Sequence, residues 1–297
     1  VDRSRGLGDV YKRQQPHWQA GMLDVIYEDG EIFVSYTEDR GDDKTSTSIA
    51  RGFIENDSFS KIENIFQSGS SWNNIHWGSR LMFKDGLLYA SIGERGYGSI
   101  AQDPTSYFGK MIRINKDGTA PKDNPYSMNE DWLPEIYQIG LRNPQGIMLY
   151  PNDSEIYITN HGPRGGDFFG KVEAGTNYGW ADVAWGGIDY DGSIIGDGSA
   201  WKEGLLKPIY TWVPSIAVSD MTFYGGDLFP ELKNKILVTS LKAQRLISLE
   251  FDGKKARNET TLFEKVGRVR DVETNSAGEI YVIIDNEDSG IWKLVNK

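Results

Sequence analysis

The sequence predicts an all-β fold, a six-bladed β-propeller of four-stranded antiparallel blades, from three observations. A strand-like pattern recurs five times, with copies that start at residues 30, 86, 154, 234 and 278. The last two copies start 44 residues apart, close to the roughly 40–50 residues of one propeller blade. No amphipathic helical pattern longer than about two turns is present. Five copies and a sixth expected upstream give six blades, so the chain is expected to be N-terminally truncated.

Each copy of the pattern has the composition of a β-strand that follows a turn. Its centre is apolar and rich in β-branched or aromatic residues, and a short apolar strand lies upstream of it. The Asp85-Gly86 dipeptide is typical of a tight hairpin turn between two such strands. The five copies are GEIFVS (30–35), GLLYAS (86–91), SEIYIT (154–159), NKILVT (234–239) and GEIYVI (278–283).

The organisation of the chain favours one domain over two. No Pro- or Ser-rich linker divides it, so residues 15–297 are expected to form a single β-propeller domain. Residues 1–14 match neither the repeat nor a leader pattern. We interpret them as a non-native or artefactual segment.

Composition excludes several classes of function. A formal net charge of −11 argues against nucleic acid as a partner. No apolar run is long enough for a membrane span. The absence of cysteine removes disulfides, thiolate metal sites and cysteine nucleophiles, and is compatible with an oxidising compartment.

Polar residues occupy equivalent places ahead of four of the copies. Gln19, His76, Asn143 and Arg268 stand 10 or 11 residues before the copy that follows each, and Arg142 precedes Asn143. Equivalent positions of a radial repeat face a common axis. These side chains are therefore expected to converge on one pocket, which indicates an active site.

The residue types at these places suit acid–base chemistry on an anionic ligand. Histidine takes up a proton near neutral pH, so His76 is a candidate general base, although a buried, hydrogen-bonded histidine is the plainer alternative. Arg142 could polarise a carbonyl or bind a carboxylate, unless an acidic neighbour pairs with it. Lys242, Arg268 and Arg270 add positive charge in an acidic protein, which favours an anionic ligand over scattered surface charge.

The Gly- and Pro-rich segment 160–167 leaves backbone carbonyls exposed that could coordinate a hard cation such as calcium. An ordinary structured turn is the alternative. The segment lacks the Lys-Ser/Thr of a phosphate-binding loop, which argues against a nucleotide site. Aromatic residues around Trp180 and Trp212 could wall a pocket, or pack in the core.

Taken together, these motifs resemble those of the soluble quinoprotein sugar dehydrogenases, the glucose/sorbosone dehydrogenase family, and especially its bacterial aldose sugar dehydrogenase branch. The resemblance extends from about Gln19 to Leu294. It is carried by QAGMLDV (19–25), HWGSR (76–80), GKMIR (109–113), RNPQG (142–146), HGPRGGD (161–167), NYGW (177–180), VPSIA (213–217) and RVRDV (268–272).

The resemblance implies a six-bladed propeller that binds pyrroloquinoline quinone (PQQ) and Ca²⁺ and oxidises aldoses to lactones. His76 matches the base that takes the proton of the anomeric hydroxyl while hydride passes to the quinone, and Arg142 matches the residue that stabilises charge on the quinone oxygen. The backbone oxygens of Gly162, Pro163 and Tyr178 match calcium ligands. The positions matched to cofactor binding are Gln19, Arg142, Asn143, Tyr210, Ser215, Lys242, Arg268 and Arg270.

The family further implies an external electron acceptor, a periplasmic or secreted location, and a monomer or homodimer. Three departures from its pattern stand out. Phe168 replaces an acidic ligand of a structural calcium site, Ile75 stands where the glucose-specific branch has Asp, and strands before Gln19 are absent. These departures leave the structural calcium and the preferred sugar open.

Two other functions remain open. A non-catalytic propeller of the same family could bind carbohydrate or protein, although such a module has no need for a base beside several cations. A calcium-dependent lactonase would call for acidic and amide side chains around an axial metal, whereas the candidates here are mostly His, Arg and Lys.

Overall fold

The computed structural model describes residues 19–56, 58–287 and 289–295. The segment 1–14, interpreted above as non-native, lies outside these residues. The described chain forms two compact units. The first comprises the residues up to Pro144 together with Glu173–Ala181, and the second comprises Gln145–Val172 and the residues from Asp182 onward.

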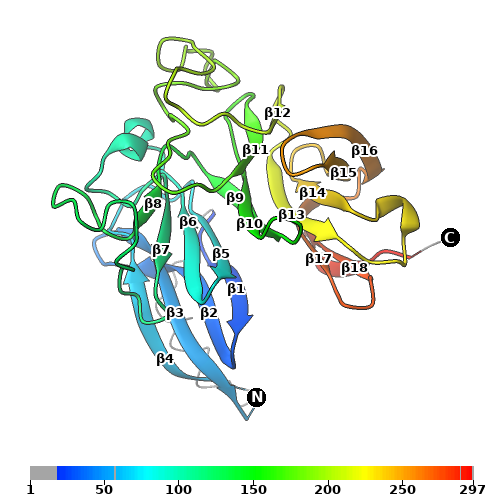
Figure 1. The fold of residues 1–297 in the computed structure, drawn as a ribbon, viewed down its shortest axis with the longest axis horizontal. Coiled ribbons are helices and arrows are strands. Elements are labelled where there is room, and N and C mark those ends of the chain that lie inside the picture. Colours follow the sequence, from blue (N-terminus) through cyan, green and yellow to red (C-terminus); the bar gives the residue numbers. More distant parts are fainter. Residues whose placement is uncertain (1–18, 57, 288, 296–297) are drawn as a thin grey trace. The chain divides into compact units, whose positions relative to one another are not determined.

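The first unit contains two four-stranded antiparallel sheets, each with its strands in sequence order (Figure 1). A short 3₁₀ helix, Gly98–Gln102, follows the second strand of the second sheet. The sheets consist of β1 (Met22–Glu28), β2 (Glu31–Asp39), β3 (Thr45–Glu55) and β4 (Ser58–Gln67), and of β5 (Gly78–Lys84), β6 (Leu87–Ile92), β7 (Lys110–Ile114) and β8 (Ile136–Gln138).

The second unit contains two further four-stranded sheets and one of three strands. A 3₁₀ helix at Pro230–Leu232 precedes the second strand of the middle sheet. The sheets consist of β9 (Pro144–Tyr150), β10 (Glu155–Asn160), β11 (Asp167–Lys171) and β12 (Tyr210–Trp212); of β13 (Val218–Tyr224), β14 (Lys235–Ser240), β15 (Arg245–Phe251) and β16 (Ala256–Glu264); and of β17 (Arg268–Thr274), β18 (Ile280–Asp285) and β19 (Gly290–Lys293).

The all-β propeller class is confirmed, and the blade count is corrected. The five copies of the pattern become the second strands of five sheets, so the described residues form five blades and not the six that were expected. The physical reason is that only five copies of the pattern are present to supply second strands. The expectation of four strands in each blade fails for the last sheet, which has three.

The hairpins follow from local turn chemistry. Asp29-Gly30 joins β1 to β2 and Asp85-Gly86 joins β5 to β6, and all four residues have positive φ. Two positive φ values in a two-residue loop define a type I′ turn, whose twist matches that of the flanking strands. The hairpin predicted at Asp85-Gly86 is therefore confirmed.

Each unit has its own apolar core. In the first unit the core lies between the two sheets, where Phe33 and Phe83 pack edge to face with ring centroids 4.9 Å apart. Burial of each such side chain contributes about 1.5–3 kcal/mol. Strand β5 alternates between half-buried and buried positions, as expected for a strand with one face in a core. No helix among the residues placed by the structure is long and apolar enough to cross a membrane.

Candidate active site

His76 stands directly ahead of β5, as the repeat predicts, and its backbone is in the left-handed region with φ of +52°. Its N–H donates to the Gln19 side-chain oxygen at 3.0 Å. The side chain is 14% exposed. A non-glycine residue with positive φ costs about 1–3 kcal/mol and persists only where its surroundings fix it. The backbone of His76 is thus held in an unusual conformation, and its imidazole is partly accessible.

The imidazole of His76 is paired with Glu94, whose side chain is 1% exposed. A carboxylate oxygen of Glu94 meets Nδ1, and the other accepts the N–H of Gly98 at 2.6 Å. Because an ionised carboxylate can only accept hydrogen bonds, Nδ1 carries the proton and Nε2 is left as the basic nitrogen. This is the arrangement that a general base requires.

Electrostatics keep Glu94 ionised. Burial raises its pKa, but the hydrogen bond and charge of His76, the N–H of Gly98 and the charge of Arg142 lower it, and the net pKa is below the usual value. An ionised Glu94 stabilises a protonated His76. The pair can therefore accept a proton at Nε2 and hold the resulting charge.

Arg142 and Asn143 lie against the same segment. The N–H of Glu94 donates to the Arg142 carbonyl at 2.9 Å, and the N–H of Gly78 donates to the Asn143 side chain at 3.1 Å. The Arg142 side chain is 5% exposed, and its guanidinium carbon lies 5.3 Å from the ring centre of Trp180. The structure thus brings Gln19, His76, Arg142 and Asn143 together within the first unit.

Tyr178 also belongs to the first unit. It is buried, and its N–H donates to the Ile139 carbonyl at 3.1 Å. Phe168, which occupies the place of the acidic ligand expected beside it, belongs to the second unit. The calcium role of Tyr178 stays a prediction.

In the second unit, one buried carboxylate organises the predicted calcium-binding loop. Asp167 accepts the N–H of Gly162 at 2.8 Å, the Ser215 hydroxyl at 2.9 Å and the N–H of Val218 at 3.1 Å. Burial raises its pKa, and these neutral donors lower it by less. Asp167 therefore ties Gly162 to Ser215, and Pro163 is buried next to them.

The three predicted cations of the second unit differ in whether their side chains are paired with a carboxylate. Arg268 and Arg270 both pair with Asp285, at 3.3 and 2.9 Å, and Arg270 also donates to Gln145 at 3.3 Å. The Lys242 side chain is exposed, and its N–H donates to the Ile216 carbonyl at 3.1 Å. Of these three predicted cations, the two guanidinium groups are therefore paired and the ammonium group is exposed.

Tyr210 stands apart from this group. It lies on β12, at the opposite end of its sheet from β9, and its hydroxyl donates to Glu259 on β16 at 3.3 Å. Its hydroxyl is therefore engaged with a strand that carries none of the other predicted site residues.

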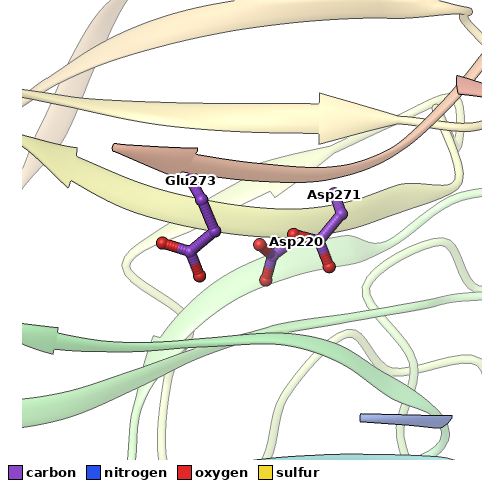
Figure 2. A group of neighbouring side chains, drawn as sticks. All are labelled: Asp220, Asp271 and Glu273. Atoms are coloured by element: carbon purple, nitrogen blue, oxygen red, sulfur yellow. The ribbon is translucent and has the colours of Figure 1, made fainter. Parts of the chain in front are cut away.

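An acidic group in the second unit was not predicted from the sequence. Asp220 on β13 and Asp271 and Glu273 on β17 place carboxylate oxygens within 4.8 Å of one another (Figure 2). The backbone N–H of Val272 donates to Asp220 at 3.4 Å. Carboxylate oxygens suit hard cations, although calcium usually takes 6–8 oxygen ligands. Asp220 is buried, Asp271 is half-buried and Glu273 is exposed. None of the three is among the ligands predicted from the sequence.

Sequence reasoning also missed Glu94 and Asp285, which hold predicted site residues. A signal for both was present, because each stands two or three residues after a copy of the repeat pattern, where β6 and β18 end. A search for polar residues at the end of the second strand of each repeat, or within two residues after it, would have found them.

The antiparallel blades and the His76–Glu94 pair define a β-propeller protein with a candidate acid–base site. The chain belongs to the glucose/sorbosone dehydrogenase family, whose model matches residues 4–293. This is a family of sugar dehydrogenases, which are oxidoreductases.

Individual relatives agree with this assignment. The chain is 33% identical to the aldose sugar dehydrogenase YliI of Escherichia coli (strain K12) over 97% of this chain and 80% of that protein. It is 31% identical to the quinoprotein glucose dehydrogenase B of Acinetobacter calcoaceticus over 63% of this chain and 44% of that protein. The crystal structure of the soluble aldose sugar dehydrogenase of Escherichia coli in its apo form matches with a TM-score of 0.87, 32% identity, and coverage of 94% of this chain and 83% of that one.

Proposed function

We propose that the protein oxidises aldose sugars at the anomeric carbon to lactones, with PQQ as cofactor and calcium beside it. The observation that carries the proposal is the His76–Glu94 pair in a member of a sugar dehydrogenase family, since it makes Nε2 the basic nitrogen of His76. Arg142 contacts the same glutamate through its backbone and its charge. The name of the Acinetobacter relative, a quinoprotein, supports the choice of cofactor.

In this proposal His76 Nε2 accepts the proton of the sugar's anomeric hydroxyl, and Glu94 stabilises the imidazolium that forms. Arg142 supplies a buried positive charge for the negative charge that develops during oxidation. When bound, PQQ would supply the acceptor for the two electrons and the hydrogen that leave the anomeric carbon.

The donor chemistry of the chain fits a flat, polyanionic cofactor. In the first unit, Gln19, Arg142 and Asn143 are the proposed cofactor-binding residues. In the second unit, the guanidinium groups of Arg268 and Arg270, the ammonium group of Lys242 and the side chains of Ser215 and Tyr210 have this proposed role. Cations and amide groups are the partners that carboxylates prefer.

The carbonyls of Gly162 and Pro163 are the proposed ligands of the calcium ion. Hard cations prefer oxygen ligands, and the hydrogen bond from Gly162 to Asp167 supports this role because it fixes the backbone at that point. The Tyr178 carbonyl belongs to a second proposed calcium site. An external electron acceptor, a periplasmic or secreted location and a monomeric or homodimeric state complete the proposal.

The test is to mix the purified protein with PQQ and Ca²⁺ and to follow reduction of a dye acceptor with a panel of aldoses. We expect sugar-dependent reduction that requires PQQ. A folded sample that binds no PQQ would favour the carbohydrate- or protein-binding alternative. Hydrolysis of a lactone in the absence of PQQ would instead support the lactonase alternative.

A further inference from the structure

Arg95 is a fully buried cation directly after Glu94, and neither the sequence motifs nor the proposed mechanism uses it. Its guanidinium carbon lies 3.4 Å from the ring centre of Trp77 and 5.8 Å from that of Phe108. Cation–π contacts of this kind are worth about 0.5–2 kcal/mol. Arg95 therefore stacks on the residue that follows His76.

The polar contacts of Arg95 fall on the residues that precede His76. Its Nε donates to the Ile75 carbonyl at 3.1 Å, and its Nη2 donates to the Asn73 carbonyl and to the Thr45 hydroxyl, the latter at 3.0 Å. One rigid guanidinium thus holds the chain on both sides of His76. A planar fork of donors is suited to fixing several acceptors at once.

The segment around His76 needs such support. His76, Gly78 and Ser79 all have positive φ, and two of the three are not glycine. Besides the side chains of Gln19 and Asn143, the residue ahead of Glu94 also supports this segment. Gly93 donates to the Trp77 carbonyl at 3.0 Å, and a Cβ at Gly93 would lie 1.9 Å from the His76 carbonyl oxygen. The two backbones are therefore in direct contact.

Arg95 is a costly way to obtain stability alone. Its hydrogen-bond acceptors are neutral, and its Nη1 is buried without a hydrogen-bond partner. Burial lowers its pKa to about 9, so it stays charged at neutral pH. Because an apolar side chain of similar volume often serves stability equally well in place of a buried charge, a role in placing His76 accounts better for the contacts.

We propose that Arg95 is a positioning residue for His76, and that its guanidinium fixes the backbone of residues 73–77 so that the imidazole meets Glu94. As a statement about catalysis, this rests on the function proposed above. It assigns one task to each of three consecutive residues. Gly93 admits the His76 backbone, Glu94 orients the imidazole, and Arg95 holds the chain on either side of it.

The test compares Arg95→Met and Arg95→Lys with the unaltered protein by two readouts. The first is the imidazole N–H proton signal of His76 in the protein without cofactor, assigned by its loss in His76→Gln. The second is kcat and KM in the dye assay. We expect Arg95→Met to lose or broaden the signal and to lower kcat at least tenfold with KM within about twofold, and Arg95→Lys to restore part of both.

Lys110→Met is the matched control. Lys110 is also a fully buried basic side chain of the first unit, although burial lowers its pKa to about 7. It donates to the backbone carbonyls of Ile100 and Phe108 at 2.9 and 2.8 Å, and neither of these residues is next to His76 in the sequence. We expect this variant to lose stability and to keep both the proton signal and kcat.

An Arg95→Met protein that folds and retains both the proton signal and kcat would overturn the proposal. If this variant does not fold, Arg95→Lys decides, because a single ammonium group cannot reproduce all the contacts, and wild-type values for it would also overturn the proposal. If the unaltered protein shows no PQQ-dependent activity, the proposed function fails, while the proton signal still tests the positioning of His76.

Discussion

Two buried carboxylates, one in each unit, are held in opposite ways. Glu94 in the first unit is 1% exposed and faces His76 and Arg142, and its pKa is lowered in spite of burial. Asp167 in the second unit is 0% exposed and faces only neutral donors in its principal contacts, and its pKa is raised by burial.

The difference shows that burial does not decide what a carboxylate does, whereas its partners do. A carboxylate with cationic partners keeps its charge and can stabilise charge that appears on a neighbour. A carboxylate that gathers hydroxyl and backbone N–H groups fixes a loop. We therefore expect changes around Glu94 to affect catalysis first, and changes at Asp167 to affect stability first.

Removal of the imidazole that pairs with Glu94 should have the largest effect. Under the proposed function, His76→Ala is expected to lower kcat by roughly 10³- to 10⁴-fold, because it removes the group that accepts the proton of the sugar. PQQ affinity, measured by titration of the protein with cofactor, should stay within a few-fold of the unaltered value. Loss of PQQ binding together with normal turnover per bound cofactor would contradict the assigned role.

Replacement of the acid itself should come next. Glu94→Gln puts an amide beside Nδ1, and if its N–H₂ group faces the ring, the proton moves to Nε2 and the base is lost. We expect kcat to fall by about 10²-fold or more, measured by dye reduction at saturating sugar.

A matched control for that variant is Glu38→Gln in the same unit. Glu38 is also buried, but it accepts hydrogen bonds from Ser48 and Gln67, far in sequence from the residues proposed for catalysis. Its kcat should be unchanged. Equal losses of kcat in the two variants would show that replacing a buried glutamate of this unit lowers kcat whatever its partners are. That result would contradict a specific role for the contact between Glu94 and His76.

In the second unit the expected effect is on stability. Asp167→Ala leaves the N–H groups of Gly162 and Val218 and the Ser215 hydroxyl without their acceptor. Each unsatisfied buried group costs about 1–3 kcal/mol, so we expect a loss of roughly 3 kcal/mol or more in the free energy of unfolding in urea. Asp167→Asn keeps one acceptor oxygen and should lose less. An unfolding free energy for Asp167→Ala equal to that of the unaltered protein would exclude a structural role for this carboxylate.

The sequence alone predicts the strands better than it predicts which groups contact the buried carboxylates. Period-two patterns predict second strands at 86–91 and 154–159, and β6 and β10 lie within one residue of those ranges. They succeed because alternation of apolar side chains is a local property of a strand with one buried face. The expectation of a sixth blade had no copy of the pattern to support it, since the sequence contains five copies.

The candidate site was predictable only in part, for a physical reason. His76, Arg142 and Asn143 stand at the heads of strands, and the structure brings them together in the first unit. Glu94 and Arg95 act through a turn after β6 whose approach to His76 depends on tertiary packing at Gly93. No periodicity in the sequence encodes that approach.

The charge of Glu94 also predicts how stability depends on pH. Because its pKa in the folded protein lies below the ordinary glutamate value of 4.5, its contribution to stability is present above 4.5 and is lost as pH falls through the lowered pKa. As pH rises through this range, the unfolding free energy of the unaltered protein should therefore increase relative to that of Glu94→Gln. Urea unfolding of both proteins at a series of pH values measures this difference. A difference that does not change with pH would mean that folding does not lower the pKa of Glu94.

The smallest effect is expected where a carboxylate has cationic partners but is not buried. Asp285 pairs with Arg268 and Arg270, and the side chains are 44%, 49% and 36% exposed. Solvent and salt screen such pairs, which are usually worth no more than about 1 kcal/mol. We expect Asp285→Ala to lower the unfolding free energy by about 0.5 kcal/mol at low salt and by less at high salt. A salt-independent loss of unfolding free energy as large as that of Asp167→Ala would contradict this expectation. It would mean that the exposed cationic partners of Asp285 stabilise this unit as strongly as the buried neutral donors of Asp167 do.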